Sequence, residues 1–171
     1  MDVLKAINTK RAVRQFTDQP VPPEVLDKIL ESALRAQSSK NTQPWQLVAV
    51  RERETLVALS KLGDYMGHVA GASVCVAFAA PSDQPWIYFD LGQCAAYLQL
   101  AAHELGVGSC IGAIYHPAEA KALLHVPQEM SLLAVVSLGY PAPTHRPAVM
   151  GGRKRLTDAV HWETWDSREV S

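Results

Sequence analysis

The stretch from Ala36 to Trp45 constrains the fold most, because it joins a clear helical pattern to a clear strand pattern. It reads Ala-Gln-Ser-Ser-Lys-Asn-Thr-Gln-Pro-Trp, almost entirely short hydrogen-bonding residues and turn formers. Such side chains compete with backbone hydrogen bonds, so the sequence predicts a loop here. Pro44 disfavours helical backbone before it, and we expect Trp45 to anchor the loop exit in the core. The loop fits either a polar cradle for a planar, hydrogen-bond-rich ligand or a solvated connection.

Regular apolar patterns flank this loop. Pro22 and Pro23 favour a helix start, and the apolar residues of 25–34 recur at three- and four-residue steps, which predicts an amphipathic helix. Continuous apolar runs predict buried strands at 47–50, 73–80 and 132–138. Further helices are expected at 2–9, 52–62, 117–124 and 91–105, the last capped by Asp90 and ended by Gly106. Taken alone, helices alternating with strands favour a parallel α/β sheet.

The composition limits the class of protein. With 171 residues, 48% of them hydrophobic and 19% charged, the chain is predicted to form one globular domain over 1–171. A net charge of −1 indicates neither a nucleic-acid nor a membrane partner. The N-terminus lacks a basic segment followed by an apolar run, so we expect a cytoplasmic protein. Cys75, Cys94 and Cys110 show no CxxC spacing and are expected to be reduced and buried.

Several chemistries are excluded by missing motifs. The six histidines include no HExxH pair, so no metal site is predicted. There is no GxSxG elbow, no Walker A loop and no paired carboxylate. The glycines of 106–112 lack the dinucleotide-binding spacing and follow a helix rather than a strand. No side chain is therefore assigned as catalytic, which fits an enzyme whose cofactor carries the chemistry.

Four separated segments together resemble one known family. They are Lys10-Arg11-Ala12-Val13-Arg14-Gln15-Phe16, the 36–45 loop, the helix from Asp90 to Leu105-Gly106-Val107-Gly108, and Gly139-Tyr140-Pro141 followed by Arg153-Lys154-Arg155. In this order they resemble the nitroreductase family of FMN-dependent oxidoreductases. Three positions depart from the family pattern: Lys10 replaces Arg and keeps the charge, Ala12 replaces Ser and lacks its hydroxyl, and Gln37 replaces Pro.

The resemblance implies an α+β fold, with a central, mainly antiparallel sheet between helices. It also implies a homodimer in which the C-terminal segment, about 142–171, packs on the partner subunit. The sequence supports a packed tail, because Trp162 and Trp165 would otherwise be exposed.

The resemblance also implies an FMN site. Lys10, Arg11 and Arg153 should bind the phosphate, with Arg155 in reserve, although cations at 10 and 11 also suit a helix C-terminus. Arg14 should approach the O2/N1 edge of the ring. Ala12 lies in the same segment and is counted with the site.

Other parts of this site should hold the ring and the ribityl chain. Ser38, Ser39 and Asn41 are expected to reach it from the partner subunit, and Ile111 and Gly112 to line one ring face. His68 is the candidate for the pyrimidine edge, with Tyr65 where the family often has Asn; a surface histidine on a short helix is equally compatible with the sequence. Trp86, Tyr88 and Phe89 form an aromatic cluster that belongs to the core, an interface or the substrate mouth.

The function implied is an oxidoreductase that takes electrons from NADH or NADPH. It would reduce nitro compounds, quinones or related small acceptors by ping-pong hydride transfer through the flavin N5. The alternative is a flavin-binding protein without turnover, serving storage or regulation.

Overall fold

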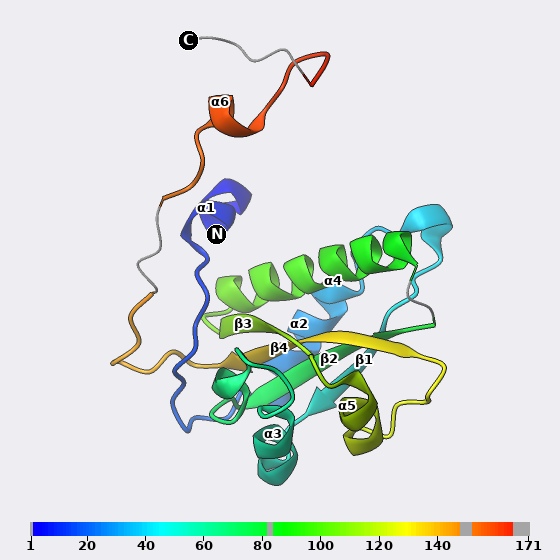
Figure 1. The fold of residues 1–171 in the computed structure, drawn as a ribbon. Coiled ribbons are helices and arrows are strands. Elements are labelled where there is room, and N and C mark those ends of the chain that lie inside the picture. The colour runs from blue at the N-terminus through cyan, green and yellow to red at the C-terminus, as the bar shows by residue number, and fades with distance from the viewer. Residues whose placement is uncertain (1, 82–83, 148–151, 166–171) are drawn as a thin grey trace.

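The computed structural model describes residues 2–81, 84–147 and 152–165 (Figure 1). Its elements, in chain order, are α1 (Val3–Thr9), α2 (Pro23–Ala33), η1 (Ser39–Asn41), β1 (Gln46–Val50), α3 (Arg53–Leu59), η2 (Gly67–Val69), β2 (Val74–Ala80), α4 (Pro85–Glu104), β3 (Gly108–Ala113), α5 (Pro117–Leu123), β4 (Ser131–Gly139) and α6 (Leu156–Ala159). Among these described residues, no helix is long and apolar enough to cross a membrane.

The four strands form one sheet in the order β1-β2-β4-β3, and every neighbouring pair is antiparallel. The expectation of an α+β fold with an antiparallel sheet is confirmed. The parallel arrangement that local order alone favours is wrong, because element order does not fix strand direction. A register shift interrupts the β2–β4 ladder between Phe78, which pairs with Ala134, and Ala79, which pairs with Leu132. Leu133, the extra residue, is partly exposed.

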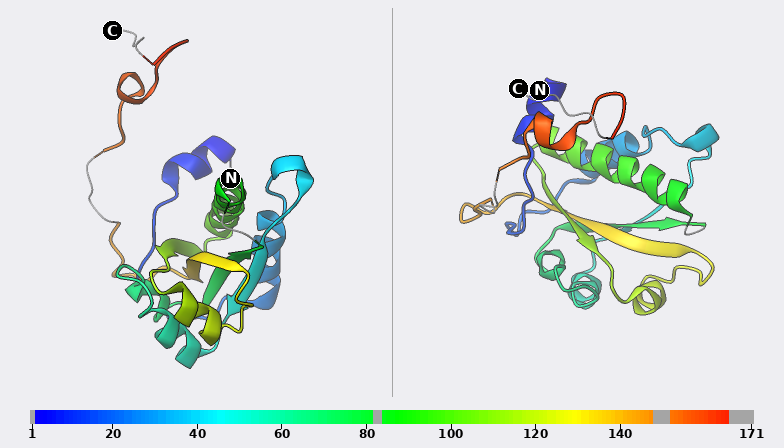
Figure 2. Two further views of the ribbon diagram at one scale, coloured as in Figure 1. Left: turned by 45° about the vertical axis from the view of Figure 1, so that its right-hand side comes forward. Right: turned by 45° about the horizontal axis from the view of Figure 1, so that its top comes forward.

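Helices cover both faces of the sheet, and each face has its own core (Figures 1 and 2). Val74, Val76 and Phe78 of β2 point toward α2 and α4, and Trp45 is buried in the same core, as predicted. The alternate β2 residues, including Cys75 and Ala77, point toward α3, η2 and α5. Because both faces are covered, β2 is buried along its whole length, which explains its continuous apolar sequence.

Two sequence-based expectations are wrong. The helix expected from Leu91 begins at Pro85, with Gln84 as its N-cap, so Asp90 lies inside α4 and is buried rather than capping it. Proline suits the first helical turn because its missing N–H has no intrahelical acceptor there. The second error is a missed strand: the glycine-containing stretch after α4 is β3, the edge strand beside β4.

The segment after α1 runs along β3 and the end of β4. Ala12 forms a parallel bridge with Ser109, and the Val13 amide donates to the Ser109 carbonyl at 2.9 Å. The approach is close because Gly108 has no side chain: a Cβ there would lie 2.7 Å from the Val13 Cβ. This pairing places the segment that carries Lys10, Arg11 and Arg14 next to β3.

The C-terminal segment has little apolar burial. Leu156, Trp162 and Trp165 are all largely exposed, Trp165 at 79%. Figures 1 and 2 show α6 lying away from the sheet, beyond α1. Packing of this tail on a partner subunit stays a prediction.

Candidate functional site

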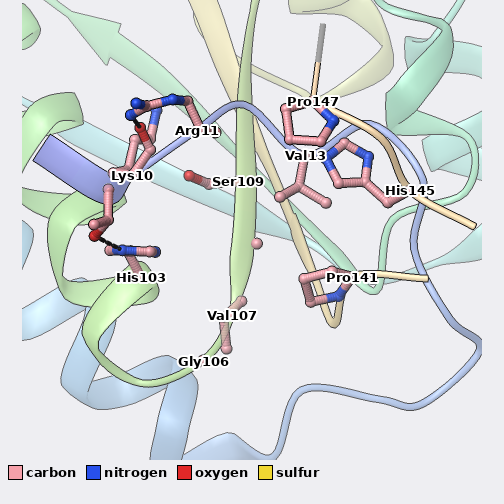
Figure 3. A pocket seen from close by; sticks show the side chains of 12 residues that line it. Lys10, Arg11, Val13, His103, Gly106, Val107, Ser109, Pro141, His145 and Pro147 are labelled. Atoms are coloured by element: carbon pink, nitrogen blue, oxygen red, sulfur yellow. Dashed lines mark hydrogen bonds between the residues drawn. The ribbon is translucent and has the colours of Figure 1, made fainter. Parts of the chain in front are cut away.

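Lys10 and Arg11 lie at the C-terminal end of α1, beside the end of α4 and the start of β3 (Figure 3). The Lys10 Nζ donates to Gln99 Oε1 of α4, and the Arg11 guanidinium donates to the carbonyls of Asn8 and Lys10, both at 2.8 Å. Burial lowers the pKa of Lys10; the nearby Cys110 thiol opposes this, and Arg14 lowers the pKa further. The two cations are thus held by neutral acceptors, which leaves their positive charge uncompensated by these contacts.

A cavity of about 370 Å³ opens beside these two cations. Thr9 and His103 form one wall: the Thr9 hydroxyl donates to the Lys5 carbonyl at 2.7 Å and lies 2.9 Å from His103 Nε2. Since the hydroxyl proton is directed to Lys5, His103 Nε2 is the donor in this pair. Val107 and Pro141 contribute apolar surface (Figure 3). The cavity therefore combines two cations with apolar walls.

Arg14 lines a neighbouring hollow together with Tyr65, Gly67, His68 and Ile111. His68 is buried, and its Nδ1 lies 2.7 Å from the Ser137 hydroxyl. Burial and the Arg14 charge lower the pKa of His68 to about 4, against the opposing effect of the Ile111 carbonyl. The imidazole is therefore neutral at pH 7, and Arg14 provides the charge of this hollow. Tyr65 lines the same hollow but is 80% exposed.

The β3 residues combine an exposed apolar side chain with bare backbone. Ile111 is 51% exposed, and the neighbouring Gly112 would place a Cβ 2.8 Å from Met66 Cγ and 3.4 Å from His68 Nε2. Cys110, between them and the cations, is buried. Burial raises the pKa of its thiol, while Arg14, through its charge and a hydrogen bond, and Lys10 lower it. Such a strand can accept a flat ring at close range.

The polar loop lies at the other end of α4. The Ser39 amide donates to the buried Asp90 carboxylate at 3.0 Å, and the Gln43 amide donates to the Ser38 hydroxyl at 2.9 Å. Asp90 and Gln99, the contact of Lys10, are separated by about 13 Å along the helix axis at 1.5 Å per residue. Figure 1 shows the loop and α1 at opposite ends of α4. One chain therefore does not bring Ser38, Ser39 and Asn41 to the cations.

The two tail arginines are also separate from the cations. Arg155 donates to Asp158 from both Nε and Nη2, each at 3.2 Å. Neither Arg153 nor Arg155 lines the cavity beside Lys10. The structure brings together Lys10, Arg11, Ala12, Arg14, His68, Ile111 and Gly112 around β3, and leaves the loop and tail residues apart.

The roles of three residues escaped the sequence analysis, which named Asp90 only as a helix cap. Ser137 is fully buried on β4 next to His68, Asp90 holds the loop, and Gln99 holds Lys10. The first two carried a signal, because a polar residue inside a buried apolar run needs a partner. Gln99 carried none, because a half-buried glutamine on a helix is unremarkable in the sequence.

Fold and site define a class: an α+β protein with a cationic pocket beside an edge strand that offers apolar surface and bare backbone. The chain belongs to the nitroreductase family, whose sequence profile matches residues 7–68 and 64–140. It is 32% identical to a protein of Methanothermobacter thermautotrophicus with the provisional name NADH dehydrogenase/NAD(P)H nitroreductase, over 96% of this chain and 88% of that protein.

Two further proteins extend this comparison. The FMN reductase [NAD(P)H] of Bacillus subtilis is 28% identical over 82% of this chain and 66% of its own length. The solved structure of an FMN-dependent nitroreductase from Clostridium difficile R20291 superposes with a TM-score of 0.85 and 27% identity, covering 95% of this chain and all of that one. The family resemblance inferred from the sequence is confirmed.

Proposed function

We propose that this chain is an FMN-dependent oxidoreductase that oxidises NADH or NADPH and reduces nitro compounds, quinones or related small acceptors. The observation that carries the proposal is the set of cations around β3, next to the exposed Ile111 and the bare backbone of Gly112. The names of the similar proteins, which include NAD(P)H nitroreductase and FMN reductase, support the same activity.

The residues present fit FMN. Lys10 and Arg11 would hold the phosphate, because ammonium and guanidinium groups form strong charge-assisted hydrogen bonds with its oxygens. Ile111 and Gly112 would face the ring, since one offers apolar surface and the other allows close approach. Arg14 would lie at the O2/N1 edge. Bound FMN would supply the hydride and electron transfer that none of these side chains can perform.

The protein itself would bind FMN, orient its ring and adjust its reduction potential. Arg14 would stabilise negative charge at the ring edge, so that the reduced form is favoured over the oxidised form. Neutral His68 adds no second charge there. No side chain has to act as acid or base in this scheme, in agreement with the missing hydrolase motifs.

The complete site would be shared between two subunits of a homodimer. Ser38, Ser39 and Asn41 would reach the partner's FMN, and the tail with Arg153 and Arg155 would pack on the partner. The exposed Leu156, Trp162 and Trp165 support such packing, as do Val3, Leu4 and Ile7, which leave the apolar side of α1 exposed.

The test begins with the purified protein. We expect a yellow protein with about one FMN per chain, because each chain contributes one Lys10–Arg11 pair to hold a phosphate. Anaerobic addition of NADH and of NADPH should bleach the flavin absorbance, and a screen of nitro compounds and quinones should then restore it. A protein that stays colourless and does not take up FMN contradicts the assignment. Flavin that binds but is reduced by neither nucleotide would instead indicate storage or regulation.

A further inference from the structure

Four residues lie close together at the hollow that Arg14 and His68 line: Cys110, Ser137, His68 and Arg14. The Ser137 hydroxyl donates to the Cys110 carbonyl at 3.3 Å and lies 2.7 Å from His68 Nδ1. Arg14 faces His68 across the hollow, and its charge lowers the pKa of the Cys110 thiol. Ser137 therefore connects Cys110 to His68, and Arg14 lies near both of them.

The direction of the hydrogen bonds follows from the number of protons. A hydroxyl has one proton to donate, and that of Ser137 points to the Cys110 carbonyl. Ser137 must then accept from His68, so the imidazole carries its proton on Nδ1. The opposite nitrogen, Nε2, is left with a free lone pair and acts as an acceptor.

Nε2 is the unsatisfied atom of this arrangement. It is enclosed and has no hydrogen-bond partner among the described residues, although the Ile111 carbonyl lies near the same imidazole and raises its pKa. A buried acceptor without a partner is unfavourable, so a nearby donor would be stabilising. The Arg14 guanidinium, with five N–H donors, faces the same hollow.

We propose that Ser137 and His68 are positioning residues for Arg14: Ser137 fixes the Nδ1–H tautomer, and His68 Nε2 accepts a hydrogen bond from the guanidinium. His68 then acts on the flavin through Arg14, rather than through the direct ring contact that the family resemblance implies. The inference rests on the proposed function only in assuming that Arg14 faces FMN. This arrangement requires a neutral His68, because a charged imidazole would repel Arg14 and could not accept a hydrogen bond from it.

The tautomer is tested by ¹⁵N NMR of the histidine side chains in the full-length protein, with and without FMN. We expect His68 to be the Nδ1–H form in wild type and to shift toward the Nε2–H form in Ser137→Ala. Ser73→Ala is the matched control, because the Ser73 hydroxyl accepts a hydrogen bond from the Val21 amide and not from His68 or Ser137. This substitution should leave the His68 signals unchanged. An Nε2–H tautomer in wild type would overturn the proposal.

The link to Arg14 is tested by a double-mutant cycle on the midpoint potential of the bound flavin. His68→Phe and Ser137→Ala should shift the potential in the same direction as Arg14→Gln, and His68→Phe should add nothing in the Arg14→Gln background. Additive shifts would mean that His68 contacts the ring itself, which contradicts the proposal. If the protein binds no flavin, the proposed function fails, whereas the tautomer measurement still decides the role of Ser137.

Discussion

The two ends of α4 contact two different parts of the proposed FMN site, a cationic half and a loop half. At its C-terminal end, Lys10 bonds to Gln99 beside a cationic cavity; near its start, Asp90 bonds to the Ser39 amide of an uncharged loop. The cationic end is fixed by strand-like pairing of residues 12–17 with β3 and the end of β4. The loop end instead contains three non-glycine residues with positive φ, namely Lys40, Asn41 and Gln43.

This difference is consistent with the proposal that a second subunit completes the site. The cationic end is preorganised inside one chain, whereas the loop adopts an unusual backbone without meeting those cations. Positive φ at several non-glycine residues is costly and persists where the structure requires it. A loop held in this way, with exposed Ser39 and Asn41, fits a role toward a second copy of the chain.

The largest expected effect comes from mixing two damaged proteins. Arg11→Gln should damage the phosphate half and Asn41→Ala, combined with Ser39→Ala, the loop half, so that each homodimer loses FMN binding. After the subunits are exchanged, each mixed dimer should contain one intact site, because the damaged cations of one subunit and the damaged loop of the other fall on the same site. FMN fluorescence quenching and nicotinamide oxidation measure the recovery.

Two controls make this result decisive. Wild type carried through the exchange fixes the maximum signal, and a mixture of Arg11→Gln with Lys10→Gln, both from the same half, should show no recovery. If the loop and cation variants also fail to complement each other, the site lies within one chain. Sedimentation at micromolar concentration checks the dimer directly.

Asp90→Ala should weaken the loop half alone. The Ser39 amide loses a charged acceptor, and such bonds contribute about 1.5–3 kcal/mol; we expect the free energy of unfolding to fall by about 2 kcal/mol, with weaker FMN binding. Asp90→Asn keeps an acceptor oxygen and should lose less. Urea denaturation gives the stability, and equal stability of all three proteins would contradict this role.

The sequence predicted most of the regular elements better than the contacts that hold the two ends of α4. Regular apolar patterns indicated α2, β1, β2 and β4, because burial on a fixed face leaves a periodic trace. β3 left no such trace: Gly108 and Gly112 weaken a strand pattern, and the same glycines suggest turns. Asp90 resembled a helix cap because its real role, accepting from a loop 51 positions earlier, depends on tertiary structure.

Gly108→Ala should loosen the anchoring of the cationic half. The new Cβ would lie 2.7 Å from the Val13 Cβ, and a β-branched neighbour cannot move away cheaply. We expect a loss of about 1–3 kcal/mol in unfolding free energy. Gly92→Ala in α4 is the control, since its Cβ meets nothing within 4 Å; replacing a helical glycine should stabilise the protein by about 0.5–1 kcal/mol. If both substitutions changed the unfolding free energy in the same direction, the close contact of Gly108 with Val13 would not explain the result.

Arg14→Gln should distinguish an effect on the midpoint potential of bound FMN from an effect on phosphate binding. A hydrogen bond to a charged group contributes on the order of 1.5–3 kcal/mol, and about 30 mV corresponds to 1.4 kcal/mol for two electrons. The midpoint potential of bound FMN should therefore fall by roughly 30–65 mV, with most of the affinity kept. Weaker binding at unchanged potential would make Arg14 a phosphate ligand, and no change in either would make it a surface residue.

The smallest effect concerns His68, which lies behind the cationic half and has no counterpart at the loop end. Its pKa in the folded protein is lowered to about 4 by burial and Arg14, from an ordinary value of 6.5. Between these values the unfolded chain binds the proton more readily than the folded protein does, so acidification favours unfolding. The contribution of His68 is fully present above pH 6.5 and is lost as the pH falls toward 4. From pH 7 to 5.5 the loss should be about 1 kcal/mol. His68→Phe keeps a ring in this space but cannot titrate, so its unfolding free energy should fall less over the same interval. Parallel pH profiles for the two proteins would show that His68 titrates normally, and that burial beside Arg14 does not hold it neutral.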